Sequence, residues 1–187
     1  MSAPAQKPPV DVRVGSSTDG LAPVSVAERS HAAGAHEWAG LGAVAGAAIV
    51  ADQITKRIVA GTLELGESRH VAGPLDLHHV QNSGIAFGLF PEATTIVIAL
   101  TAMVIAWLLV VFARSGARHP VMPVGLGLVV GGSVSNLADR VRLGHVTDFL
   151  DLDFWPAFNL ADTFIVVGVA LLVGAALISD RPHTRHR

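Results

Sequence analysis

Four long stretches of the chain lack charged residues and are rich in apolar side chains. They cover residues 38–51, 93–113, 121–138 and 163–179. A helix rises about 1.5 Å per residue, so about 20 apolar residues, with about 17 as the lower limit, cross bilayer hydrocarbon roughly 30 Å thick. Three stretches are long enough alone, and the first is long enough if it includes Asp52. The pattern predicts four transmembrane helices.

The segments between these stretches predict a smaller region outside the membrane. The membrane spans themselves should be helices, because hydrocarbon offers no partner to backbone polar groups, and the alternation of barrel strands is absent. Residues 75–80 are strand-like, with turn signals at residues 73–74 and 83–84. We therefore expect an all-α polytopic membrane protein, with four transmembrane helices and a small extracytoplasmic β-rich cradle.

The two ends of the chain differ from its middle. Residues 1–36 are rich in Pro, Ala, Ser and Gly without apolar periodicity, which predicts a disordered tail. The first apolar stretch starts at Trp38, too late for a cleaved signal peptide, so we expect the first helix to be retained. The expected domains are this tail, a four-helix membrane domain over residues 37–180, and a basic tail over residues 181–187.

Basic residues near the helix ends predict the orientation in the membrane. They lie in the N-terminal tail, between the second and third helices, and in the C-terminal tail: Lys7, Arg13, Arg29, Arg114, Arg118, Arg181, Arg185 and Arg187. The positive-inside rule then places both termini in the cytoplasm. Residues 57–92 and 140–158 are expected on the extracytoplasmic side.

Composition supports the membrane prediction and excludes several kinds of chemistry. Only 15% of the residues are charged, against about 25% in soluble domains, and 51% are hydrophobic. Contact with membrane lipids is therefore expected. The absence of cysteine excludes thiol catalysis, disulfides and thiolate metal sites. The net charge of -2 gives no reason to expect a nucleic-acid partner.

Polar residues at the ends of the predicted helices are the candidates for function. A carboxylate at membrane depth costs at least about 2.5 to 3.5 kcal/mol, so it normally marks a functional site or an internal pair. The tetrapeptide Asn-Leu-Ala-Asp occurs at residues 136–139 and again at residues 159–162. In each copy the amide and the acid are three residues apart and share a helix face. Two helices thus present an amide and an acid towards a common place.

A second polar pair lies in the first helix. Asp52 and Lys56 are four residues apart and share a face, with the acid before the base, which is the favourable order. A structural ion pair and direct contact with a substrate are equally compatible with this spacing.

Asp162 has several possible partners for acid–base chemistry. Two carboxyl groups within hydrogen-bonding reach share one proton, so the charged member can activate water while the protonated member polarises a scissile carbonyl. This is the chemistry of an aspartic peptidase. Spacing alone leaves four candidates to pair with Asp162: Asp139, Asp148, Asp151 and Asp153. Asp139 has Arg140 beside it, and Asp151 and Asp153 are expected to be solvated loop acids. Asp148 is expected at the end of the third helix or in the loop just beyond it, from where it could meet Asp162 at the membrane surface.

Other motifs are weaker. Ser133 and Ser135 form no nucleophile elbow and are more typical of close helix packing. The adjacent His78 and His79 would point to opposite faces of a strand, and His145 is alone, so we expect no metal and no cofactor.

Two other classes of function compete with a peptidase. A small proton-coupled transporter would use Asp52, Asp139 and Asp162 as a relay through the membrane depth. A membrane scaffold would use the same acids to fix the helix register.

Four ordered segments resemble the lipoprotein signal peptidases, or type II signal peptidases, of bacterial cytoplasmic membranes. These segments are residues 52–56, 82–88, 131–149 and 158–162, and the resemblance covers about residues 38–179. It implies a metal-free aspartic peptidase, with its active site near the extracytoplasmic face. Such an enzyme cleaves prolipoproteins just before a diacylglyceryl-modified cysteine. The matching catalytic aspartates are Asp148 and Asp162.

The resemblance also implies roles for the surrounding polar residues. Four of them would hold the substrate backbone or orient the two aspartates: Asn82, Asn136, Arg140 and Asn159. Asp52, Lys56 and Asp139 would be supporting polar groups. The segment 61–92 would form a cradle and partial lid, and the enzyme is expected to act as a monomer. The N-terminal tail lies outside the resemblance, and the link from Asp148 to Asn159 is shorter than in many relatives.

Overall fold

A computed structural model describes residues 32–83, 94–115 and 119–179 of the chain. Several sequence predictions lie outside these residues. They concern most of the N-terminal tail, the C-terminal tail with its basic residues, and residues 84–88 of the second matching segment.

The described residues form four helices at the positions of the four apolar stretches. These are α1 (Ala35–Thr62), α2 (Thr94–Ser115), α3 (Met122–Leu143) and α4 (Leu160–Ser179). Within the described part of the chain, α1, α2 and α4 are long and apolar enough to cross a membrane. Helix α3 does not meet that criterion, because it is rich in glycine and its last turns carry Asp139, Arg140 and Arg142.

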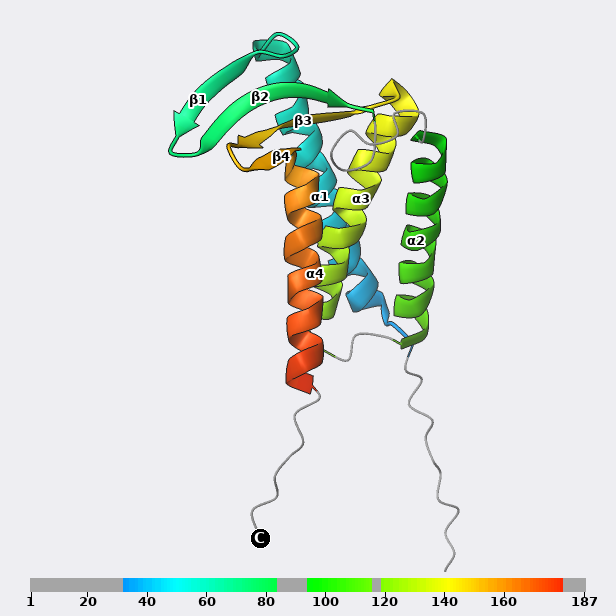
Figure 1. The fold of residues 1–187 in the computed structure, drawn as a ribbon. Coiled ribbons are helices and arrows are strands. Elements are labelled where there is room, and N and C mark those ends of the chain that lie inside the picture. Colours follow the sequence, from blue (N-terminus) through cyan, green and yellow to red (C-terminus); the bar gives the residue numbers. More distant parts are fainter. Residues whose placement is uncertain (1–31, 84–93, 116–118, 180–187) are drawn as a thin grey trace, which may run out of the picture. The chain divides into compact units, whose positions relative to one another are not determined.

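Helix α3 is the centre of the helical bundle. It packs against α1, α2 and α4 (Figure 1). Its glycines allow close approach of the backbones: a Cβ atom on Gly131 would lie 2.7 Å from the carbonyl oxygen of Ala45 in α1, and one on Gly132 would collide with the backbone of Ala161 in α4. Small residues at such contacts are typical of helix packing in membranes.

A four-stranded antiparallel sheet lies at one end of the helices (Figure 1). Its order is β1 (Ser68–Ala72), β2 (Leu75–Asn82), β3 (Val146–Leu152) and β4 (Trp155–Phe158). The strand predicted over residues 75–80 is part of β2, and the turn predicted at residues 73–74 joins β1 to β2, with Gly73 at φ +56°.

The placement of Asp148 corrects one sequence expectation. We expected this residue at the end of the third helix or in the loop beyond it, but it lies in β3. Helix α3 stops at Leu143 because Gly144 adopts the left-handed conformation, φ +77°, and donates its N–H to the carbonyl oxygen of Arg140. The chain then turns into the sheet, where Asp148 is opposite Val80 of β2.

Apolar packing and backbone hydrogen bonds hold the sheet on the end of α1. Val59 of α1 and Leu63, the residue that follows the helix, form a buried cluster with Phe149 of β3. The Nδ1 atom of His79 lies 3.0 Å from the carbonyl oxygen of Leu63, and the backbone N–H of His79 donates to Glu67. The sheet therefore has a defined position over the helix ends.

The close contact of α3 with α1 predicts that one methyl group added at Gly131 lowers the stability of the protein. Gly131→Ala should lower the free energy of unfolding by about 1 to 3 kcal/mol, because the new Cβ would meet backbone atoms of Ala45 that cannot move aside. Gly42→Ala in α1 is the matched control, since a Cβ there meets nothing within 4 Å. Thermal unfolding in detergent micelles measures both, and equal melting temperatures would contradict the prediction.

Candidate active site

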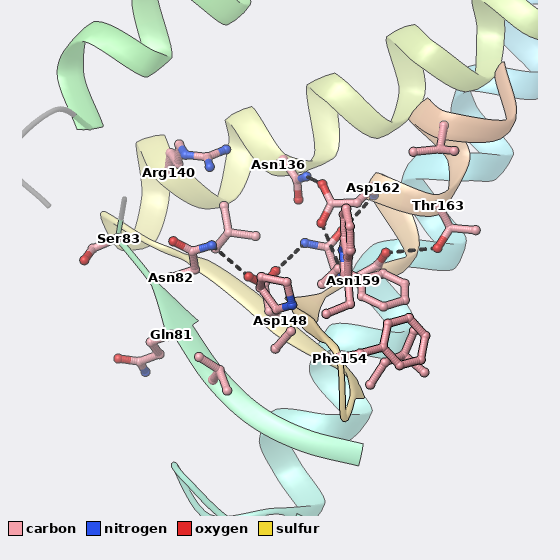
Figure 2. Close-up of a pocket in the computed structure, with 18 of the residues that line it drawn as sticks. Gln81, Asn82, Ser83, Asn136, Arg140, Asp148, Phe154, Asn159, Asp162 and Thr163 are labelled. Atoms are coloured by element: carbon pink, nitrogen blue, oxygen red, sulfur yellow. Dashed lines mark hydrogen bonds between the residues drawn. The ribbon is translucent and has the colours of Figure 1, made fainter. Parts of the chain in front are cut away.

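A cavity of about 780 Å³ lies between the sheet and the helices α3 and α4 (Figure 2). One group of lining residues is polar: Gln81, Asn82, Ser83, Asn136, Arg140, Asp148, Asn159, Asp162 and Thr163. The other group is apolar: Val80, Val146, Leu152, Phe154, Trp155, Pro156, Ala157, Phe158, Val166 and Val167. The cavity can therefore receive a molecule with both polar and apolar parts.

Asp148 reaches this cavity from strand β3 and is only 3% exposed. Both of its carboxyl oxygens accept hydrogen bonds from amide groups: Asn82 donates to Oδ2 over 2.9 Å, and Asn159 donates to Oδ1 over 2.7 Å. Burial raises the pKa of Asp148 to about 6, although the two amide donors act in the opposite direction. This carboxyl group therefore keeps a proton at a higher pH than an exposed aspartate does.

Asp162 lies in the first turn of α4, next to Asn159, the residue that precedes the helix. The backbone N–H of Asp162 donates to Oδ1 of Asn159 over 3.0 Å, and the backbone N–H of Asn159 donates to Oδ2 of Asp162 over 3.2 Å. These reciprocal bonds have the pattern of a capping box. The amide of Asn136 donates to the remaining oxygen, Oδ1, over 2.8 Å.

Asn159 connects the two aspartates. Its amide N–H group donates to Asp148, while its oxygen accepts the N–H of Asp162, and both carboxyl groups line the same cavity (Figure 2). Of the four candidate partners of Asp162, Asp148 alone lines that cavity with it. Asp139 forms an ion pair with Lys56, Asp151 contacts His78 over 2.7 Å, and Asp153 is exposed.

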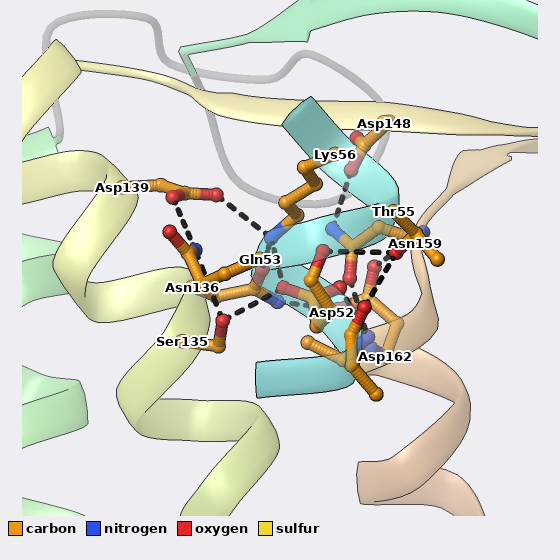
Figure 3. Close-up of polar contacts among 12 residues, drawn as sticks. Asp52, Gln53, Thr55, Lys56, Ser135, Asn136, Asp139, Asp148, Asn159 and Asp162 are labelled. Carbon is orange, nitrogen blue, oxygen red and sulfur yellow. Dashed lines mark hydrogen bonds and ion pairs between the residues drawn. The ribbon is translucent and has the colours of Figure 1, made fainter. Parts of the chain in front are cut away.

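A buried polar network lies behind the cavity (Figure 3). The Nζ atom of Lys56 is 2.7 Å from each of three acceptors, which are carboxylate oxygens of Asp52 and Asp139 and the amide oxygen of Asn136. Asp52 is fully buried and also accepts the hydroxyl of Ser135 over 2.7 Å and the backbone N–H of Ala161 over 2.8 Å. Asp52 and Lys56 thus form an internal ion pair and do not line the cavity.

Gln53 is a member of this network that sequence reasoning missed. Its amide donates to Asp139 over 2.7 Å and to the hydroxyl of Ser135 over 3.1 Å. Ser135, which sequence reasoning assigned to helix packing, is fully buried and bonds to Asp52. Gln53 lies beside Asp52 and three positions before Lys56 in a largely apolar helix. This position was the signal from which its role in the network could have been predicted.

The two adjacent histidines have different partners. His78 contacts Asp151, whereas the Nδ1 atom of His79 contacts the carbonyl oxygen of Leu63. Their side chains diverge, as expected for neighbours in a strand.

Comparison with known proteins identifies relatives over most of the chain. The sequence matches the family described as signal peptidase (SPase) II over residues 44–178. A lipoprotein signal peptidase of Pelotomaculum thermopropionicum is 45% identical over 141 residues, which cover 74% of this chain and 93% of the relative. A lipoprotein signal peptidase of Symbiobacterium thermophilum is 38% identical over 143 residues, which cover 73% of this chain and 93% of the relative.

Two solved structures are similar in fold, and both are described as bacterial membrane enzymes determined by the in meso method. The one at 2.3 Å resolution has a TM-score of 0.70 and 29% identity, and the match covers 77% of this chain and 92% of that chain. The one at 1.9 Å resolution has a TM-score of 0.66 and 32% identity, and the match covers 74% of this chain and 92% of that chain.

The buried network predicts that Asp52 contributes strongly to stability. Asp52→Ala should lower the free energy of unfolding by about 3 to 5 kcal/mol, because it removes an anion from a buried ion pair and leaves the N–H of Ala161 without this acceptor. The exposed Glu64→Ala is the control and should change stability by less than about 0.5 kcal/mol. Thermal unfolding of both variants in detergent tests this, and similar melting temperatures would refute it.

Proposed function

The chain belongs to the signal peptidase II family, so it is a protease that cleaves signal peptides from prolipoproteins, and we propose that Asp148 and Asp162 are its catalytic dyad. The observation that carries this proposal is the placement of a buried carboxyl group, Asp148, and a half-buried one, Asp162, on one amphipathic cavity, joined through the amide of Asn159. No metal ion is needed for the chemistry that such a pair performs.

The two aspartates have different roles in hydrolysis. Asp162 is the ionised member and takes a proton from a water molecule, whose oxygen attacks the scissile carbonyl carbon. Asp148 holds the shared proton and donates a hydrogen bond to the carbonyl oxygen, where negative charge develops. The tetrahedral intermediate then collapses: the proton that Asp162 took from the water passes to the amide nitrogen, and the C–N bond breaks. Burial of Asp148 supports its role as the protonated member.

The two halves of the cavity fit a lipid-modified peptide. The polar half, with Asn82 and Arg140, is suited to hold the peptide backbone beside the dyad. The apolar half includes Phe154 and Trp155 on the sheet and Val166 of α4, which is 68% exposed. An acyl chain can therefore lie along the outer face of α4. This arrangement supports cleavage just before a diacylglyceryl-modified cysteine.

The position of the cavity supports an active site at one membrane surface. The family and the three apolar helices support a protein of the bacterial inner membrane. We place α3 as a fourth span, because it packs against all three of these helices. The sheet and the dyad then lie at the extracytoplasmic face, with both termini in the cytoplasm. Large apolar side chains exposed on α2, such as Leu100, Met103 and Trp107, would contact lipids, and the protein would act as a monomer.

The dyad predicts that neutral isosteres abolish cleavage. Asp148→Asn and Asp162→Asn should each lower kcat/KM roughly 10³-fold or more, because neither variant can share and transfer the proton. Asp151→Asn and Asp153→Asn, two acids of the same segment that do not line the cavity, are matched controls and should stay within about twofold of the native rate. Cleavage of a purified diacylglyceryl prolipoprotein in detergent measures all four. Substantial activity in either dyad variant would refute the assignment.

The environment of Asp148 predicts the pH dependence of cleavage. Because burial raises the pKa of Asp148 to about 6, its proton is lost as the pH rises through this value, and kcat/KM should fall on the alkaline side. Asn82→Ala removes an amide donor that stabilises the ionised form of Asp148. The pKa of Asp148 should therefore rise further, and the alkaline limb should move to higher pH.

A histidine that titrates in the same range could imitate this behaviour. His78→Gln is the control, since His78 contacts Asp151 of the same sheet and does not line the cavity. An alkaline limb that disappears in this variant, or that stays in place in Asn82→Ala, would contradict the prediction.

A further inference from the structure

We propose that Lys56 is a positioning residue, which fixes the amide of Asn136 in the orientation that donates to Asp162 and so keeps Asp162 the ionised member of the dyad. This inference rests on the proposed function. Lys56 does not line the cavity, so it acts on the reaction only through the groups that it contacts.

The buried ammonium group of Lys56 lies among three acceptors that fix its position. The residue is 4% exposed, and an ammonium group has three donors and no acceptor. The three acceptors at 2.7 Å come from two helices: Asp52 on α1, and Asp139 and Asn136 on α3 (Figure 3). The ammonium group therefore forms ion pairs with the two carboxylates and donates a hydrogen bond to the oxygen of Asn136.

This contact determines which way the amide of Asn136 faces. Because Lys56 can only donate, the amide oxygen must face it, and the NH₂ group must then face Asp162, over 2.8 Å. The flipped amide would place its NH₂ group against the ammonium and its oxygen against the carboxylate. Both contacts would be repulsive, so the ammonium of Lys56 and the carboxylate of Asp162 favour the same orientation of the amide.

The consequence for Asp162 is that donors face both of its oxygens. The amide of Asn136 donates to Oδ1, and the backbone N–H of Asn159 donates to Oδ2 at the N-terminal end of α4. A carboxylate accepts both bonds, whereas a protonated carboxyl group has lost part of its acceptor capacity. The end of a helix with free N–H groups also favours a negative charge.

Other charged groups also surround Asp162. Helix α1 contributes Asp52 and Lys56, α3 contributes Arg140, and β3 contributes Asp148, while Asp139 of α3 is paired with Lys56. Arg140 is a second cation of this set, and it lines the cavity itself. Lys56, in contrast, does not line the cavity and acts through its hydrogen bond to the amide oxygen of Asn136.

The test is the pH profile of Lys56→Met, in which a neutral side chain of similar length replaces the ammonium. With Asn136 free to turn and a positive charge lost, Asp162 should take up a proton at higher pH, so the acidic limb of kcat/KM should move up by about one pH unit or more. At saturating substrate, kcat should fall about tenfold or more. KM should change less than kcat, because Lys56 does not line the cavity.

Gln53→Leu is the matched control. It removes two hydrogen bonds from the same network, to Asp139 and Ser135, but none to Asn136. A merely structural role of the network predicts similar profiles for the two variants, whereas the proposal predicts an unmoved acidic limb in Gln53→Leu. An unmoved limb in Lys56→Met, or equal shifts in both variants, would overturn the proposal.

A double-mutant cycle tests whether Lys56 acts through Asn136. Asn136→Leu should shift the acidic limb in the same direction, and Lys56→Met should add nothing to it in the double variant. Additive effects would overturn the proposal. If Lys56→Met does not fold, Asn136→Leu keeps both ion pairs of Lys56, and an unmoved acidic limb in this variant would overturn the proposal.

The two proposals fail in different ways. Activity that persists in Asp148→Asn or Asp162→Asn would refute the dyad itself. Inactive dyad variants, together with a native acidic limb in Lys56→Met or in Asn136→Leu, would refute only the positioning role of Lys56.

Discussion

The burial of one ammonium group among the helices constrains the rest of this structure. A charge taken out of water costs several kcal/mol unless it is paired and hydrogen-bonded. Lys56 meets this condition only when Asp52 of α1 and both Asp139 and Asn136 of α3 surround it. Asp52 also accepts the N–H of Ala161, at the start of α4. One set of contacts thus fixes the register of three helices, and the same register places Asp162 on the cavity.

The tetrapeptide Asn-Leu-Ala-Asp shows how position in a helix decides what a sequence does. Inside α3, backbone N–H groups are already bonded, so Asn136 and Asp139 extend to Lys56 on α1. At the start of α4 the N–H groups lack acceptors within the helix, so Asn159 and Asp162 bond reciprocally to the backbone as a cap. The first copy contacts Lys56 and, through Asn136, Asp162, whereas the second copy contains Asp162, a member of the proposed dyad.

The apolar stretches of the sequence predicted the helices. The position of Asp148 in the site depends instead on the pairing of strands that are far apart in the sequence. The stretches without charge gave all four helices, and the alternation of residues 75–80 gave part of β2. The strand that carries Asp148 was not predicted, because its position depends on pairing with Val80 and its neighbours in β2. Gly144, in its left-handed conformation, was a local signal that α3 ends before Asp148. Spacing alone could not choose the partner of Asp162, since sequence separation does not report which acid the sheet brings back to α4.

The proposed dyad therefore comes from two elements that different interactions hold in place. Asp162 is fixed by the polar contacts at the start of α4, while Asp148 is fixed by the strand that carries it. Neighbouring side chains of a strand point to opposite faces, so Asp148 can face the cavity while Phe149 packs with Val59 and Leu63 at the end of α1. Apolar burial on one face of β3 thus supports the proposed catalytic group, Asp148, on the other face. The separation of the two carboxyl groups depends on the docking of the sheet as much as on the packing of the helices.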